Sequence, residues 1–177
     1  TEVMDTDGNV LKADLVIYNG DPSYAYQNLF SQMLSKPFSM KPAALTQYSM
    51  GLFVLYFGTT RKYDEVAHHT IWLGKRHKEL LRDIFEHKKL TEDFSLYVHR
   101  PTATDASFAP ENCDSFYVLC PVPNLQSGTD WRTEGPKLKK RIVSALSKSM
   151  LPLLEDHIVA DFWMSPEQAK EYGLVES

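Results

Sequence analysis

A long apolar run at residues 48–57 constrains the fold of this chain more than any other segment. It reads YSMGLFVLYF, is rich in aromatic and β-branched residues, and is bounded by turn residues. Such side chains pack well on a pleated surface, so the run predicts a long β-strand whose side chains alternate between two faces. The face predicted to line an apolar cavity carries Phe53, Leu55 and Phe57. The face predicted to pack on helices carries Met50, Leu52, Val54 and Tyr56. The plain alternative is a strand that is core throughout, and the sequence alone does not decide between the faces.

Four further strand-like runs and two longer helical patterns follow. The strands are predicted at residues 67–73, 93–100, 115–122 and 157–164. The helices are predicted at 75–87 and 136–154, where apolar residues recur at helical spacing. A short third helix is expected after Ser165 and Pro166, which suit an N-cap and a first helical position. This order predicts an α+β fold, with a mainly antiparallel or mixed sheet of about five strands and helices on one face.

The start of the chain predicts a β-hairpin followed by a helix. The turn signal Asp7-Gly8 separates two arms, and the second arm reaches residue 18. That arm contains the apolar run 15–17, which is typical of a strand buried on both faces. A helix is predicted at 22–34. Because the chain begins inside a strand pattern and without Met, we expect further sequence upstream.

The charge of the chain argues against nucleic-acid binding. The chain has 177 residues and a formal net charge of -4, whereas phosphate binding needs a concentrated basic surface. Its length suits one domain, or one domain with a fragment of another. Cys113 and Cys120 are spaced like neither a zinc pair nor a redox pair, so we expect no metal site and a reducing, cytoplasmic environment.

Two polar clusters supply candidate site residues. His68 and His69 lie in one predicted strand, and adjacent strand residues point to opposite faces, so at most one histidine reaches a pocket. The alternative is one packed and one exposed histidine. Arg100 and Asp105 flank a Pro-Thr turn at a strand end and are expected to form an ion pair there. The alternative for this second cluster is a purely structural turn.

Several long stretches resemble bacterial-type phytoene desaturases. The main ones are SMGLFVLYFG, VAHHTIWLG, KELLRDIF, EDFSLYVHRPTATDASFAPENCDSFYVLCPVPNL and TDWRTEGPKLKKRI. The stretch LKADLVIYNGDPSYAY is similar to that family's return from a strand into the flavin domain. The resemblance covers residues 1–166 and implies an internal fragment of a two-domain, amine-oxidase-like flavoenzyme, supplying mostly its substrate domain.

The resemblance implies an FAD-dependent oxidoreductase that desaturates phytoene stepwise toward lycopene. The candidate substrate-binding residues come from the strand face and the two polar clusters described above, and they are Phe53, Leu55, Phe57, His69, Arg100, Thr102 and Asp105. The cofactor-binding residues that the resemblance implies are Asn19 and Asp21. No catalytic residue is identified. The chain contains no G-x-G-x-x-G fingerprint, so by itself it is expected neither to bind FAD nor to be active.

The resemblance also implies the domain organisation and the partners. Residues 1–21 would end the flavin-binding domain, 22–164 would form the substrate-binding domain, and 165–177 would be a divergent or unrelated tail resembling the end of a Clp-type proteolytic subunit. Phytoene and related carotenoids are the expected partners, at a membrane to which a cytoplasmic protein attaches peripherally. Self-association into a homo-oligomer is left open. The alternatives are a non-catalytic isoprenoid- or lipid-binding module and a related carotenoid isomerase or ketolase.

Overall fold

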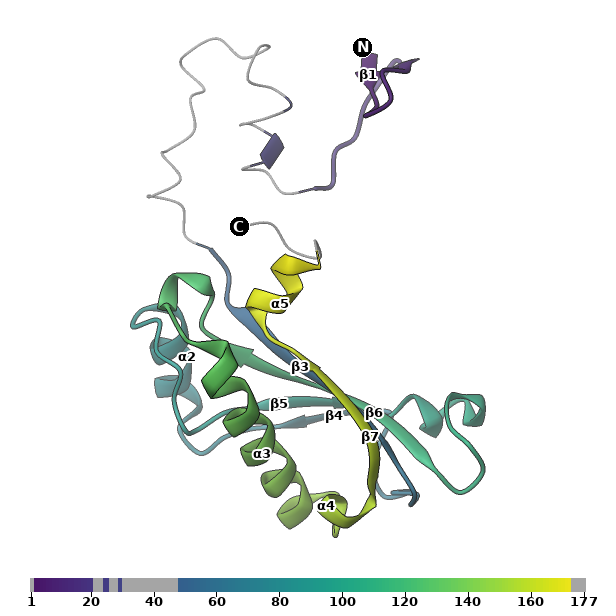
Figure 1. The fold of residues 1–177 in the computed structure, drawn as a ribbon, viewed down its shortest axis with the longest axis vertical. Helices are drawn as coiled ribbons and strands as arrows, with labels where there is room; N and C mark the ends of the chain where they lie inside the picture. The colour runs from purple at the N-terminus through teal and green to yellow at the C-terminus, as the bar shows by residue number, and fades with distance from the viewer. Residues whose placement is uncertain (1, 21–23, 26–28, 30–47, 173–177) are drawn as a thin grey trace. The chain divides into compact units, whose positions relative to one another are not determined.

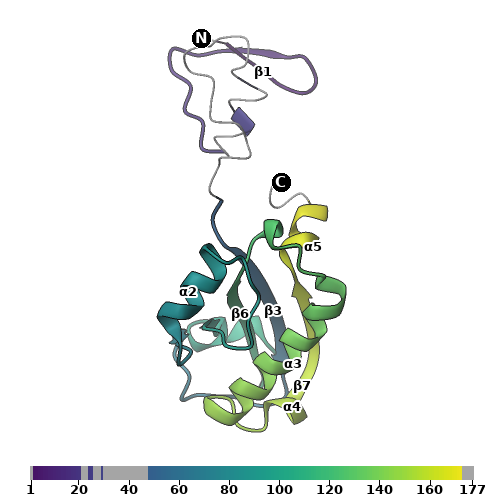
Figure 2. The ribbon, with the colours of Figure 1, turned by 90° about the vertical axis from the view of Figure 1, so that its left-hand side faces the viewer.

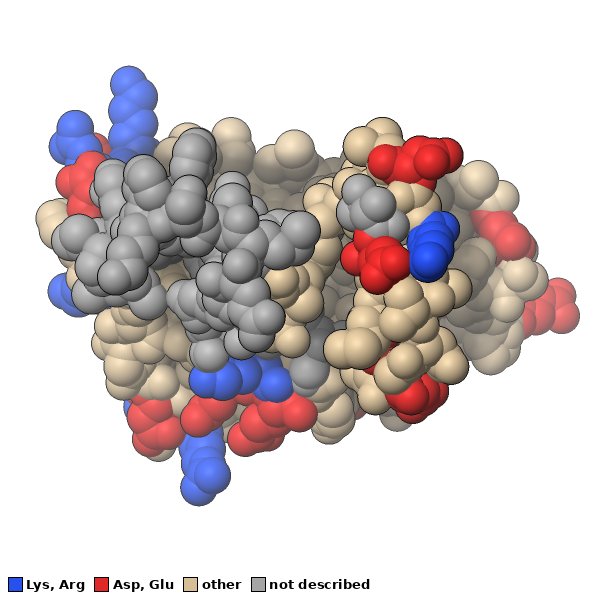
Figure 3. Space-filling view, turned by 90° about the horizontal axis from the view of Figure 1, so that it is seen from above, with Lys and Arg blue, Asp and Glu red and all other residues tan. Residues whose placement is uncertain are grey.

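The computed structural model describes residues 2–20, 24, 25, 29 and 48–172. The chain divides into two compact units, Thr1–Gln47 and Tyr48–Ser177, which are described separately. In the view of Figure 3, acidic and basic side chains are interspersed over the visible described residues. Among the described residues, no helix combines the length and the apolar character needed to cross a bilayer.

The first unit contains the predicted hairpin, with a shorter second arm. Strand β1 (Glu2–Met4) pairs antiparallel with β2 (Val10–Lys12). The Asp5 carboxylate accepts hydrogen bonds from the turn backbone, and Gly8 adopts a φ of 85°, which favours glycine. The buried strand expected at 15–17 is wrong, because these residues pair with no strand of the described chain and remain exposed. The helix predicted at 22–34 lies almost wholly outside the described residues.

The second unit is built on a five-stranded sheet, seen edge-on in Figure 1. The strands are β3 (Gly51–Thr59), β4 (His69–Trp72), β5 (Leu96–His99), β6 (Asp114–Val122) and β7 (Ile158–Met164). Their order is β4-β5-β6-β3-β7, and every neighbouring pair is antiparallel. The predicted α+β fold with an antiparallel sheet of five strands is therefore confirmed.

The longer helices cover one face of this sheet (Figures 1 and 2). The helices are α2 (His77–Phe85), α3 (Trp131–Ser149), α4 (Leu154–His157) and α5 (Pro166–Glu171). Short 3₁₀ turns lie at η4 (Pro101–Ala103), η5 (Ala106–Phe108) and η6 (Leu125–Ser127). The helical stripe expected on α3 is confirmed, since Leu138, Ile142 and Leu146 are buried in the core.

Helix α3 begins one turn earlier than the sequence predicts. Pro136 was the expected first helical residue, whereas the helix starts at Trp131 and carries Pro136 inside it. The reason is that Asp130 provides an N-cap, its side chain accepting a hydrogen bond from the backbone N–H of Arg132. The helix also ends at Ser149 rather than at Leu154, and Leu154 belongs to the separate helix α4.

Helix α5 packs onto the start of the sheet. Ser165 and Gln168 form a capping box, which confirms the predicted helix start. Ser165 and Pro166 are buried, and a Cβ placed on Gly51 would approach Pro166 Cγ to 2.8 Å. This close approach between Gly51 and Pro166 ties the segment after β7 to strand β3.

Candidate functional site

The two faces of the sheet are assigned the opposite way from the sequence-based expectation. Phe53, Leu55 and Phe57 belong to the helix-covered core, and Phe53 stacks with Trp131 and Trp163 at centroid distances of 6.1 and 5.3 Å. The set that was expected to pack on helices lies on the other face, where Leu52 and Tyr56 are exposed. The physical reason is that the apolar stripe of α3 is complementary to the Phe53 face. A substrate-binding role for the three core residues stays a prediction.

The open face carries a continuous row of ring-bearing side chains across all five strands. Residues paired directly in an antiparallel ladder project to the same side, so the strand register defines the row. From β4 to β7 the paired residues are His69, His99, Tyr117, Tyr56 and Phe162. Strands lie about 4.8 Å apart, so a row across five strands extends for roughly 19 Å. We call this set the aromatic row.

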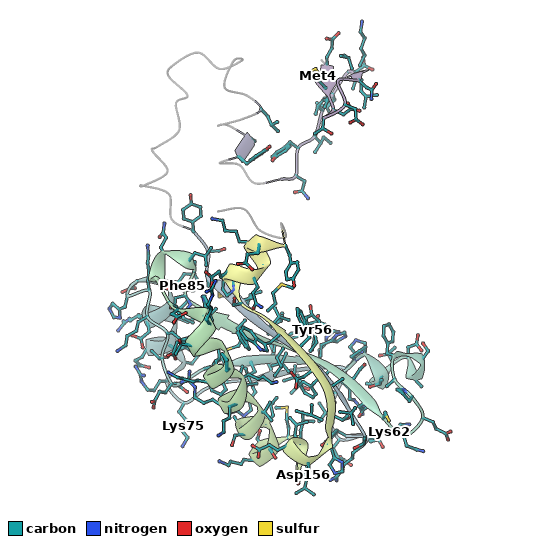
Figure 4. All side chains as sticks on the ribbon, in the orientation of Figure 1. Met4, Tyr56, Lys62, Lys75, Phe85 and Asp156 are labelled. Carbon is teal, nitrogen blue, oxygen red and sulfur yellow. The ribbon has the colours of Figure 1, made fainter. Side chains whose placement is uncertain are left out.

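Ring contacts join each member of the aromatic row to the next. The centroid of His99 lies 5.0 Å from that of His69 and 4.5 Å from that of Tyr117. Tyr56, labelled in Figure 4, lies 5.9 Å from Tyr117 and 6.3 Å from Phe162. A parallel row beside it is mostly apolar and consists of Ile71, Tyr97, Leu119, Val54 and Met164. The two rows offer an extended surface suited to contact with a hydrocarbon.

One end of the aromatic row is a cluster of three histidines. His68, His69 and His99 each offer a ring nitrogen, and these nitrogens all lie within 4.8 Å of one another. The expectation that adjacent His68 and His69 must diverge is wrong, because β4 begins at His69 and His68 precedes it. His68 is outside the pleat, and its ring centroid lies 4.3 Å from that of His69 and 4.6 Å from that of His99.

Hydroxyl groups hold the outer nitrogens of this cluster. His69 Nδ1 lies 2.6 Å from the Tyr97 hydroxyl, and His68 Nδ1 contacts the Thr104 hydroxyl. Burial lowers the pKa of His99, and the neighbouring imidazoles of His68 and His69 lower it further. Burial also raises the pKa of Tyr97. Both directions favour the neutral forms of His99 and Tyr97 near pH 7.

Arg100 does not pair with Asp105, so the ion pair expected at the Pro-Thr turn is wrong. Its guanidinium is buried and lies 3.3 Å from a carboxylate oxygen of Asp114 and 3.5 Å from one of Asp64. The Asp105 side chain instead caps η5 by accepting a hydrogen bond from the backbone N–H of Ser107. The expected pairing failed because β6 begins one residue earlier than predicted and brings Asp114 directly beside Arg100.

Asp114 is the centre of this buried polar network. Its carboxylate accepts hydrogen bonds from the Thr102 hydroxyl at 2.5 Å and from the backbone N–H of Tyr63 at 2.7 Å. Asp114 therefore joins Thr102 to Arg100, a partner that the sequence analysis did not identify. Asp105 is exposed on the same loop. Their roles in substrate binding stay predictions.

Two groups of residues remain: the predicted cofactor-binding residues, and the open-face residues that the sequence analysis missed. Asn19 lies in the first unit and is exposed, Asp21 lies outside the described residues, and cofactor binding by either stays a prediction. Sequence reasoning missed Tyr117 and Phe162 as members of the open face. Alternation within each strand could have signalled them, but only the strand order and register bring them into one row.

Comparison with known proteins identifies relatives over most of the chain. No protein-family model matches it. The chain is 42% identical over 161 residues to a lycopene-forming phytoene desaturase of Pantoea ananas, covering 90% of this chain and 33% of that protein. It is 38% identical over 170 residues to a neurosporene-forming phytoene desaturase of Rhodobacter capsulatus, covering 93% and 32%.

A third relative has a different named product. The chain is 39% identical over 151 residues to a zeta-carotene-forming phytoene desaturase of Myxococcus xanthus, covering 85% of this chain and 28% of that protein. The chain thus spans about a third of the length of the curated relatives it matches.

Proposed function

We propose, from the premise that this chain belongs to the phytoene desaturase family as a fragment, that the whole protein desaturates phytoene or a related carotenoid. The named products of the relatives are lycopene, neurosporene and zeta-carotene. In the proposed reaction a hydride and a proton leave adjacent carbons of the hydrocarbon chain, and an oxidised flavin would accept the hydride. Within that protein, we propose that this chain supplies the surface that holds the substrate.

The aromatic row is the observation that carries this proposal. A carotenoid precursor has no group to hydrogen-bond, so a protein can orient it only by shape and by apolar contact. Tyr56 and Phe162 are 45% and 46% exposed, which leaves their rings available to a ligand on the open face. Their neighbours along the row continue the same contact surface across the strands.

FAD is proposed as the cofactor of the whole protein, but the described residues do not fit it. A flavin dinucleotide needs a glycine turn between a strand and a helix N-terminus, where backbone N–H groups approach the pyrophosphate. Gly51 and Gly58 lie within β3, and Gly135 lies inside α3 against the Trp163 ring. None of the described glycines forms such a cradle, so we propose that the rest of the protein binds FAD.

Membrane association is proposed because the proposed substrate is a hydrocarbon. Phytoene and related carotenoids dissolve in the bilayer, so the enzyme must reach them there. A cytoplasmic protein attached peripherally to the membrane meets this requirement, with the open apolar surface receiving the substrate. Assembly into a homo-oligomer stays a prediction.

The test uses the full-length protein with FAD and phytoene supplied in liposomes, and it measures the carotenoid products by chromatography. Phe162→Asp places a charge in the aromatic row, where an apolar ligand would have to desolvate it. We expect at least a tenfold loss of conversion, while Phe162→Leu retains most of it. The matched control is Phe85→Asp on α2, because Phe85 is 47% exposed and lies outside the row.

Three results would separate the alternatives. Conversion by Phe162→Asp at the parent rate would exclude the aromatic row from substrate contact. Equal losses in Phe162→Asp and Phe85→Asp would indicate a general loss of folding. Binding of phytoene without any conversion or bound flavin would favour the non-catalytic isoprenoid-binding module.

A further inference from the structure

We propose that His68, His69 and His99 form a binding site for one divalent transition-metal ion of the Zn²⁺ type. Imidazole nitrogens are preferred ligands of such ions, and three histidines with an open fourth position are a recurrent zinc arrangement. The site lies at one end of the open face, on two strands and the residue that precedes one of them. It shares His69 and His99 with the aromatic row, but its test does not depend on desaturation.

The backbone brings the three rings together without loop flexibility. His69 and His99 are direct partners in the β4–β5 ladder, so their side chains leave the sheet on the same side. The backbone N–H of Arg100 donates to the carbonyl of His68 at 2.9 Å, which continues the pairing one residue beyond the ladder. His68 is thereby fixed beside His99, and the three donor nitrogens lie within 4.8 Å.

The hydrogen bonds of the cluster leave the inner nitrogens free for a metal. Histidine ligands usually donate the N–H of one ring nitrogen to a neighbouring oxygen and bind the metal through the other. The Tyr97 hydroxyl lies 2.6 Å from His69 Nδ1, and the Thr104 hydroxyl contacts His68 Nδ1. With both Nδ1 atoms donating to these oxygens, the Nε2 atoms of His68 and His69 carry the lone pairs that a metal ion requires.

The contact between His68 and His99 brings two of the candidate ligand atoms together. Their Nε2 atoms lie 2.6 Å apart, so two lone pairs would face each other unless a proton or a cation lies between them. A hydrogen bond from the His99 Nε2–H to His68 Nε2 also satisfies this contact. His99 Nδ1 is buried with no hydrogen-bond partner among the described residues in both cases, so it does not distinguish a proton from a metal ion. A metal ion bound by both Nε2 atoms removes the repulsion.

Zinc binding requires the three nitrogens to move to nearly equal separations, and pairs that now lie up to 4.8 Å apart must approach by up to about 1.5 Å. Tetrahedral ligands at a Zn–N distance of about 2.0–2.1 Å lie roughly 3.3 Å from one another. The His68 and His99 nitrogens must therefore separate by less than about 1 Å. His69 is exposed, so water or another ligand can reach the fourth position from solvent.

The test is metal binding by the full-length protein after treatment with a chelator. Calorimetry with Zn²⁺ measures stoichiometry and affinity, and the visible absorption of bound Co²⁺ reports nitrogen ligands. We expect one ion per chain. His69→Gln and His99→Gln should each weaken binding well over tenfold, and Tyr97→Phe about tenfold, because loss of a ligand-orienting group typically costs 10–100-fold. His77→Gln is the matched control, since His77 is an exposed histidine outside the cluster.

Two outcomes would overturn the metal site. One is Zn²⁺ binding that is unaffected by His69→Gln and His99→Gln, and the other is a loss of equal size in His77→Gln. Because His99 is partly buried, thermal unfolding without metal checks that each variant is folded. If His99→Gln does not fold, the result for His69→Gln decides, because His69 is exposed and lies at the start of an edge strand. Phytoene conversion is not a readout, so failure of the desaturase proposal leaves this test intact.

Discussion

Leu55 and Tyr56 are neighbours on β3, yet Leu55 is fully buried and Tyr56 is 45% exposed. The same alternation separates Val118 from Tyr117 on β6 and Val98 from His99 on β5. One set meets the stripe of α3 and forms the core. The other set carries hydroxyls, imidazoles and exposed rings on the open face. The difference shows that β3, β5 and β6 hold the fold together with one face and leave the other partly open to solvent.

Substitutions on the two faces should therefore separate stability from activity. Core residues contribute apolar burial, which is the main stabilising term in folding. Open-face residues contribute less to the free energy of unfolding, because their rings are already partly in water. The three predictions below test that contrast in the full-length protein.

The largest effect is expected from Phe53→Ala on the covered face. Phe53 is completely buried between Trp131 and Trp163, so its removal leaves a cavity as well as lost apolar contact. We expect a loss of about 3–5 kcal/mol in the free energy of unfolding. Phe162→Ala, on the open face, should cost about 1 kcal/mol or less, as surface substitutions usually do. Urea denaturation measures both.

A contrary pattern would remove the distinction between the faces. If Phe162→Ala destabilised the protein as much as Phe53→Ala, the open face would be covered in the whole protein and would count as core. The aromatic row would then be unavailable to a hydrocarbon ligand.

A smaller loss is expected from Asp114→Asn at the edge of the covered face. This substitution keeps the shape but removes the buried charge that faces Arg100, leaving the guanidinium only the exposed carboxylate of Asp64, and a poorly compensated buried charge is costly. We expect a loss of about 3 kcal/mol in the free energy of unfolding. The control is Asp105→Asn, because Asp105 is exposed and should change stability by about 0.5 kcal/mol or less. Equal effects of the two substitutions would mean that Asp114 stabilises the fold no more than an exposed carboxylate does.

Most of the fold could be predicted from the sequence, because its signals are local. The aromatic run at 48–57, the alternation at 93–100 and the helical spacing after residue 136 each identify their element within a few residues. The start of α3 was missed because Asp130 and Pro136 both suit a helix start, and the cap at Asp130 prevailed. The apolar run at 15–17 was misread because burial depends on neighbours that a local pattern does not contain.

The candidate site was much less predictable, because it depends on register. Nothing in the sequence indicates that Tyr117 lies opposite Tyr56, or that His99 lies opposite His69. A shift of one residue in either ladder would turn these side chains to the other face. The histidine cluster was not expected, because adjacent residues in a strand point to opposite faces. That rule does not apply to His68, since β4 begins only at His69.

The third prediction tests whether water is excluded from the covered face, and it uses the two cysteines of this chain. Cys120 lies on the covered face of β6 and is 1% exposed, whereas Cys113 precedes that strand and is half-buried. Burial raises the pKa of the Cys120 thiol from 9.0 to about 12, and Arg141 opposes this only in part. Above pH 9 the unfolded chain loses this proton while the folded chain keeps it. The stabilisation is therefore complete below pH 9 and is lost as the pH rises toward 12.

Between these pH values Cys120 should contribute a loss of about 1.4 kcal/mol in stability for each pH unit. Tyr and Lys residues also titrate there, so the measurement is the difference in slope between the parent protein and Cys120→Ala in urea denaturation at several pH values. The variant is expected to be less stable at neutral pH and to have the shallower slope. In the folded parent at pH 8, a maleimide should modify Cys113 much faster than Cys120, because only a thiolate that solvent can reach reacts readily. Identical slopes together with equal labelling would mean that water enters between α3 and the sheet, and the covered face would then resemble the open one.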